Sequence, residues 1–157
     1  MNELIRVEPI ALLPTQAGCA VFLGDENKVI VFYIDPSIGA SINAILAKAE
    51  PPRPLTHDLF TLTLEAFGAE VLHTTIVDVQ GDVFYSRLYI KAENEIMERK
   101  IVELDARPSD CIAMAVRQQA PIFVVPEVWA RLEDVSETLS DLRNQPSETG
   151  GYGLEIE

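Results

Sequence analysis

Two short stretches of the chain combine an arginine, a proline, a hydroxyl residue and an aspartate at a point where the pattern predicts that a helix begins. The first is Arg53-Pro54-Leu55-Thr56-His57-Asp58, and the second is Asp105-Ala106-Arg107-Pro108-Ser109-Asp110. Proline suits the first turn of a helix because its missing N–H would have no partner there anyway. Aspartate suits the same turn because the helix dipole and the free backbone N–H groups attract a carboxylate.

If the two helix starts meet in space, their side chains form one polar cluster, which is the candidate site. Its members are Arg53, His57, Asp58, Asp105, Arg107, Ser109 and Asp110. His57 would lie in the first turn of its helix, where the positive end of the dipole favours the neutral imidazole, the form that accepts a proton or binds a metal ion.

Each member of the cluster also has a structural interpretation. Asp58 and Asp110 stand where helix caps favour a carboxylate, and Ser109, like Thr56, is typical of a cap or first turn rather than of a nucleophile. Arg53 and Arg107 could pair with Asp110 and Asp58 across the two helix starts. His57 could be a hydrogen-bonded or surface histidine. The residue types alone leave these alternatives open.

Hydrophobic periodicity predicts the elements that would hold this cluster. Strands are expected over 4–13, with Pro9 marking an edge or a bulge, and over 19–23, 28–34, 71–79, 83–92, 99–105 and 121–126. Helices are expected from Pro36 to about 49, from a Thr56 cap to about Phe67, from Pro108 onward, around Trp129, and over 134–143. This order favours a single α+β domain with mixed or antiparallel sheets and three to four packed helices.

The helix expected over 56–67 has unusually broad apolar character. Its apolar residues are Leu55, Leu59, Leu62 and Ala66 on one stripe, widened by Phe60, Leu64 and Phe67. Such breadth predicts a helix buried on most of its sides. The wide apolar helix faces also lead us to expect a homo-oligomer, since they leave surface to cover.

Length and charge bound the class of protein. The 157 residues suit one domain with a real core, and no apolar run approaches the roughly 18 residues of a membrane span. The N-terminus lacks the layout of a secretory signal, and Cys19 and Cys111 show no spaced pattern, so we expect a cytoplasmic protein without membrane association. The net charge of −13 differs from the basic footprint of most nucleic-acid binders, so a nucleic-acid partner would require a local basic patch or bound cations.

The stretches Pro52–Leu59 and Asp105–Ala113 resemble motifs of the bifunctional nuclease domain family. The resemblance covers roughly residues 4–132 and includes Val21-Phe22-Leu23-Gly24 and Pro121-Ile122-Phe123-Val124. It implies a bifunctional-nuclease-like domain over 1–132, followed over 133–157 by an acidic helical segment and a mobile tail. Where family members carry a Gly and, three residues on, a Glu at the start of the first helix, this chain has Asp35 and Ile38.

The family is described as nucleases that act on both DNA and RNA, so the resemblance implies hydrolysis of phosphodiester bonds with a divalent metal, Mg²⁺ or Mn²⁺. The implied catalytic residues are His57, Asp58 and Asp110, and the implied metal ligands are Asp58, Asp105 and Asp110. Arg53, Arg107 and Ser109 would bind the nucleic-acid substrate. The alternative is a non-catalytic oligomeric binding or scaffold protein, in which the two motifs serve only as helix caps and ion pairs.

Overall fold

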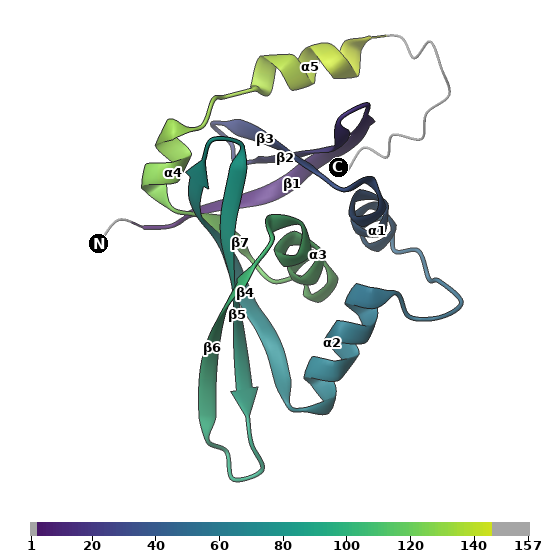
Figure 1. Cartoon of the computed structure of the whole chain (residues 1–157), viewed down its shortest axis with the longest axis vertical. Helices are drawn as coiled ribbons and strands as arrows, with labels where there is room; N and C mark the ends of the chain where they lie inside the picture. Colours follow the sequence, from purple (N-terminus) through teal and green to yellow (C-terminus); the bar gives the residue numbers. More distant parts are fainter. Residues whose placement is uncertain (1–2, 146–157) are drawn as a thin grey trace.

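The computed structural model describes residues 3–145 as an α+β domain built on one mixed sheet (Figure 1). The sheet has seven strands in the order β3-β2-β1-β7-β4-β5-β6. Neighbouring strands are antiparallel except β4 and β7, which run parallel. The strands are β1 (Ile5–Thr15), β2 (Gly18–Gly24), β3 (Val29–Ile34), β4 (Ala69–Gln80), β5 (Val83–Glu93), β6 (Arg99–Ala106) and β7 (Ile122–Val124).

Five helices accompany the sheet, and four of them have more than seven residues. They are α1 (Pro36–Leu46), α2 (Thr56–Ala66), α3 (Pro108–Gln118), the short α4 (Pro126–Arg131) and α5 (Ser136–Asn144). The predicted single α+β domain is therefore confirmed. Residues 3–145 contain five helices where three to four packed helices were expected, and each of the five lies at a helical segment that the pattern predicted. None of the helices within residues 3–145 is long and apolar enough to cross a membrane. The predicted mobile tail lies mostly outside the described residues.

Helix α3 is the element around which the others pack (Figure 1). Pro108 occupies its first turn as predicted, and Gln119 ends it in the left-handed conformation. One side of α3 places Ile112 in the main core with β1, β2 and α1, and another side places Met114 against β4 and β5. Because α3 is buried on both sides, its first residues are fixed relative to the sheet.

Helix α1 begins at Pro36 as predicted, and Asp35 caps it by accepting a hydrogen bond from the Ser37 N–H at 2.8 Å. Gly39 lets this helix approach β2 closely: a Cβ at that position would lie 2.5 Å from the Cys19 Sγ. The bulge predicted at Pro9 is confirmed by a register shift between Pro9 and Ala11, within a strand that has neighbours on both sides.

Two expectations about α2 were wrong. Leu55 is the N-cap residue and Thr56 is already the first residue of the helix, so Thr56 does not cap it. The helix is also not buried on most sides, because Thr61 is its one fully buried residue while Leu59 is 59% and Phe67 80% exposed. Within one chain, α2 contacts α3 and β4 along one side and presents its broad apolar side to solvent.

Candidate active site

The starts of α2 and α3 converge, and the residue that joins them is His57. Its Nε2 lies 3.1 Å from Asp110 Oδ1 across the two helices, although 53 residues separate them in sequence. The His57 side chain is 14% exposed and that of Asp110 33%. The two helix openings therefore meet as predicted, at a position that solvent can still reach.

Arg107 holds the second oxygen of the same carboxylate. Its Nε lies 2.8 Å from Asp110 Oδ2 within the first turn of α3. Partial burial alone would raise the pKa of Asp110, but the hydrogen bonds from Arg107 and His57 outweigh that effect, and the pKa lies below its ordinary value. Asp110 is consequently an anion shared between an arginine and the imidazole.

A third helix start contributes a charge near this group. The hydrogen bond with Asp110 raises the pKa of Arg107, and the negative charge of Asp35 at the start of α1 adds a smaller effect in the same direction. Asp35 itself is held by Ser37, whose hydrogen bonds lower the pKa of that carboxyl. The Arg107 guanidinium is 69% exposed, so it remains open to an anionic ligand while it orients Asp110.

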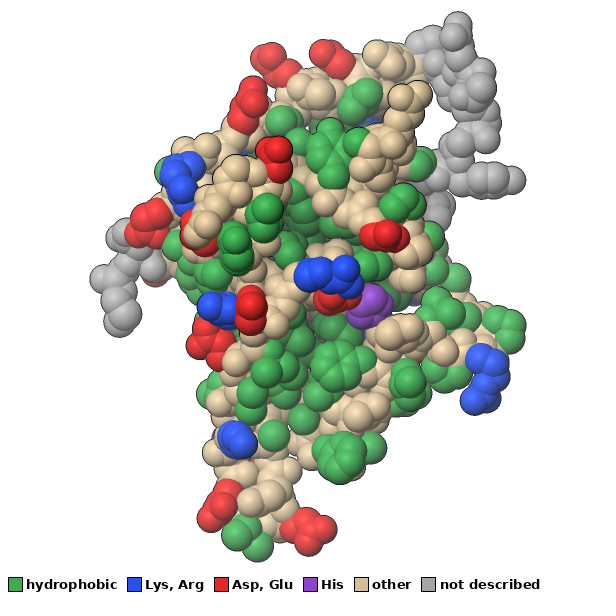
Figure 2. Space-filling model, in the orientation of Figure 1, with side chains coloured by type: hydrophobic (Ala, Val, Ile, Leu, Met, Phe, Trp, Pro, Cys, Tyr) green, Lys and Arg blue, Asp and Glu red, His purple; other side chains and the backbone are tan. Residues whose placement is uncertain are grey.

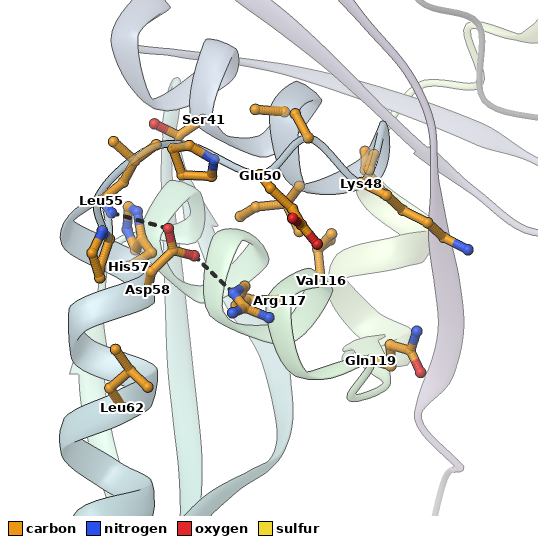
Figure 3. A pocket seen from close by; sticks show the side chains of 16 residues that line it. Ser41, Lys48, Glu50, Leu55, His57, Asp58, Leu62, Val116, Arg117 and Gln119 are labelled. Carbon is orange, nitrogen blue, oxygen red and sulfur yellow. Dashed lines mark hydrogen bonds and ion pairs between the residues drawn. The ribbon is translucent and has the colours of Figure 1, made fainter.

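Asp58 has a partner that the sequence did not indicate. Its Oδ1 accepts a hydrogen bond from Arg117 Nε at 2.7 Å, and its Oδ2 accepts one from the Leu55 N–H at 3.0 Å (Figure 3). The backbone hydrogen bond is the main cause that lowers the pKa of Asp58. The predicted crosswise pairing is wrong on both sides, because Arg107 pairs with Asp110 of its own helix and Asp58 pairs with Arg117 at the end of α3.

The remaining predicted site residues lie apart from this group. Asp105 on β6 is 75% exposed and pairs with Arg87 of β5 at 2.8 Å. Arg53 is exposed in the loop before α2 and makes no ion pair among residues 3–145. Ser109 is 6% exposed, which leaves little of it for a substrate to contact.

The carboxylates do not form a metal-binding cluster in this arrangement. Asp58, Asp105 and Asp110 each pair with a different arginine. Across the described part of the chain, no group of three or more His, Cys, Asp or Glu side chains could hold a metal ion. The donor set of one chain therefore does not fit the predicted divalent metal.

A groove of about 710 Å³ opens beside this group (Figure 3). His57, Asp58, Leu55 and Leu62 line it from α2, and Val116, Arg117 and Gln119 line it from the end of α3. The end of α1 and the loop after it supply the other wall, including Lys48 and Glu50. Two cations, Lys48 and Arg117, thus line the same groove as the imidazole, in a chain of net charge −13.

The arrangement can perform proton transfer. A carboxylate that accepts a hydrogen bond from Nε2–H fixes the orientation of the ring and leaves Nδ1 as the proton acceptor. Within residues 3–145, the Nδ1 of His57 has no hydrogen-bond partner. Nearby cations could neutralise a bound phosphate. The pattern of residue types found His57, Asp110 and Arg107, but it missed Lys48 and Arg117, which carry no motif and lie at the carboxyl ends of their helices.

Comparison with known proteins gives a consistent assignment. The model of the bifunctional nuclease domain matches residues 21–136. Uncharacterized protein Rv1829 of Mycobacterium tuberculosis is 35% identical over 129 residues, which cover 81% of this chain and 74% of that protein. Bifunctional nuclease 1 of Oryza sativa subsp. japonica is 34% identical over 96 residues, which cover 60% of this chain but 28% of the rice protein. Since the family model spans well over half of the chain and includes both helix starts, the protein belongs to the bifunctional nuclease domain family.

Proposed function

We propose that this protein is a nuclease that hydrolyses phosphodiester bonds of DNA and RNA in the groove beside α2 and α3. The observation that carries the proposal is the hydrogen bond between His57 Nε2 and Asp110 Oδ1 at the edge of that groove. The name of the rice relative, bifunctional nuclease 1, supports the same activity, although the similarity covers a minor part of that protein.

In the proposed reaction His57 is the general base. Asp110 holds the ring through Nε2, and Nδ1 removes a proton from the water that attacks phosphorus. As the new P–O bond forms, the P–O bond to the leaving sugar oxygen breaks, that oxygen takes a proton from solvent, and the imidazolium then releases its own proton to solvent. Asp110 remains an anion and stabilises the imidazolium that forms. Positioned proton transfer of this kind contributes about 10²- to 10⁴-fold to a rate.

The cations near the groove would bind the nucleic acid. Arg107 is exposed beside Asp110, and Lys48 and Arg117 line the groove that His57 also lines, so these three side chains are the proposed phosphate contacts. The groove lining itself carries two cations, Lys48 and Arg117, and two anions, Asp58 and Glu50, so it repels a polyanion less than the chain of net charge −13 does as a whole. The predicted Mg²⁺ or Mn²⁺ has no ligand cluster among residues 3–145 and stays a prediction, which the Mg²⁺, Mn²⁺ and EDTA arms of the assay below test.

The second candidate is the non-catalytic binding or scaffold protein. It is favoured by one observation: every carboxylate of the predicted site already has an arginine partner. In that case the ion pairs would serve only to hold α2, α3 and the sheet together.

A cleavage assay separates the two candidates. Purified protein is incubated with end-labelled single-stranded DNA and RNA in Mg²⁺, in Mn²⁺ and in EDTA. Asp110→Asn should reduce cleavage at least about 100-fold without unfolding the protein. Asp78→Asn is the matched control, because Asp78 also pairs with an arginine, Arg131, but lies outside the groove. Equal activity of the two variants would refute the proposed role, and an inactive wild type would favour the scaffold.

A further inference from the structure

The exposed residues of α2 are mostly uncharged, although the chain is strongly acidic, and Glu65 is the one ionisable residue among them. The exposed uncharged residues are here called the α2 face, and they are Leu55, Thr56, Leu59, Phe60, Leu62, Thr63, Ala66 and Phe67. The ionisable residues of the helix lie elsewhere on its circumference: His57 contacts Asp110, Asp58 contacts Arg117, and Glu65 lines a separate shallow pocket. Figure 2 shows hydrophobic side chains at the surface on the lower right of the molecule, where Figure 1 places α2.

The spacing along the α2 face is that of a helix–helix contact. Leu55, Leu59, Leu62 and Ala66 follow one another at intervals of four, three and four residues. This alternation keeps apolar side chains on one line of a helix and is the pattern by which two helices pack side by side. A partner with a flat or irregular surface would not require this regular spacing of apolar side chains.

We propose that the α2 face is a self-association surface on which α2 of a second copy of this chain packs about a two-fold axis. Charge argues for this occupant. Two copies that each carry −13 repel one another, and they meet at lowest electrostatic cost where neither presents a charge. A two-fold contact also uses the same patch twice, so one apolar stripe supplies both sides.

The exposed area is sufficient for such a contact. Five large apolar residues of the face, Leu55, Leu59, Phe60, Leu62 and Phe67, are between 38% and 80% exposed. At on the order of 200 Å² per large side chain, they leave about 500 Å² per copy, or about 1,000 Å² for a pair. This value reaches the lower limit of specific interfaces, and Thr63 and Ala66 add to it.

Association would also change the groove that contains His57. Leu55 and Leu62 belong both to the α2 face and to the lining of the groove. A second α2 seated on them would cover the α2 wall of the groove and narrow the entrance next to His57. The association itself does not depend on whether the protein is a nuclease.

Sedimentation velocity of the full chain tests the proposal. Wild type should sediment as a dimer or a larger even-numbered assembly at micromolar concentration. Leu59→Lys should raise the dissociation constant of this assembly at least 100-fold, so that the variant sediments as a monomer. Leu59 is 59% exposed, so the variant should keep the circular dichroism of the folded wild type. Tyr33→Lys is the matched control, because Tyr33 is 58% exposed on β3, and it should leave the assembly unchanged.

Crosslinking provides a second readout that does not depend on disruption. Both natural cysteines are buried, so Leu59→Cys offers a maleimide crosslinker one accessible thiol per copy. It should yield a covalent dimer in dilute solution, whereas Tyr33→Cys should not. A monomeric wild type, or an assembly that Leu59→Lys leaves intact, would overturn the proposal and assign the face to a different partner or to none.

Discussion

Replacing Asp58 with alanine removes two contacts that fix the start of α2, and with it the position of His57. One is the hydrogen bond that the Leu55 N–H donates to Oδ2 at 3.0 Å, and the other is the ion pair of Oδ1 with Arg117 at 2.7 Å. Loss of a side-chain cap costs about 1 kcal/mol. The ion pair contributes nearer 1 kcal/mol than the 3–5 kcal/mol of a fully buried pair, because Arg117 is 41% exposed.

Asp58→Ala should therefore lower the free energy of unfolding by about 2 kcal/mol, which corresponds to roughly 4–8 °C in Tm for a domain of this size. Urea and thermal unfolding measure both quantities. Asp58→Asn keeps an acceptor for the Leu55 N–H and should lose about half as much. In a double-mutant cycle, Asp58→Ala and Arg117→Ala should show a coupling energy of about 0.5–1 kcal/mol. A loss below 0.5 kcal/mol for Asp58→Ala, or a coupling energy of zero, would refute this account of how α2 is held.

Three further perturbations test other parts of the structure. The hydrogen bonds from Arg107 and His57 outweigh the opposite effect of burial and leave Asp110 with a lowered pKa in the fold, so its contribution to stability is present above the unfolded value and is lost as the pH falls through the folded value. Asp110→Asn should be less stable than wild type at neutral pH, and the difference should shrink below about pH 4. Burial lowers the pKa of His73 below its ordinary 6.5, so the free energy of unfolding of wild type should fall as the pH falls from about 6.5. Urea titrations at several pH values should show that His73→Gln lacks this dependence, and an equal dependence on pH in the two proteins would contradict the prediction. Gly39→Ala should lower the free energy of unfolding by about 1–3 kcal/mol, because the added Cβ would lie within 2.6 Å of two atoms of Cys19. A thermal melt measures the change, and a higher Tm for the variant would contradict this packing.

Local patterns of the sequence predicted the elements well. Pro36 and Pro108 mark true helix starts, Gly68 ends α2 with a positive φ, and the hairpins at 24–28 and 80–83 occur where turn residues interrupt alternating strands. The prediction that α2 is buried on most of its sides was wrong. A stripe of Leu and Phe indicates surface that avoids water, but it does not tell whether the partner lies in the same chain.

Some contacts of the candidate site could also be predicted from the sequence, and others could not. The doubled Arg-Pro pattern led to His57 and Asp110, and the two side chains meet. The partner of Asp58 was not predictable, because Arg117 is placed by the packing angle between α2 and α3 rather than by any local motif. The position of Asp105 was not predictable for the same reason. Asp105 comes shortly before α3 in the chain, yet it belongs to β6 and pairs with Arg87 on the neighbouring strand.

The two histidines of the chain allow the most direct test of the proposed chemistry. His57 contacts Asp110 beside the groove, whereas His73 stacks on Tyr89 within the sheet. Each is replaced with glutamine, and cleavage of single-stranded DNA and RNA is measured under single-turnover conditions with both variants verified as folded. The proposed role of His57 predicts at least about a 100-fold slower rate for His57→Gln and a wild-type rate for His73→Gln. A wild-type rate for His57→Gln would contradict it.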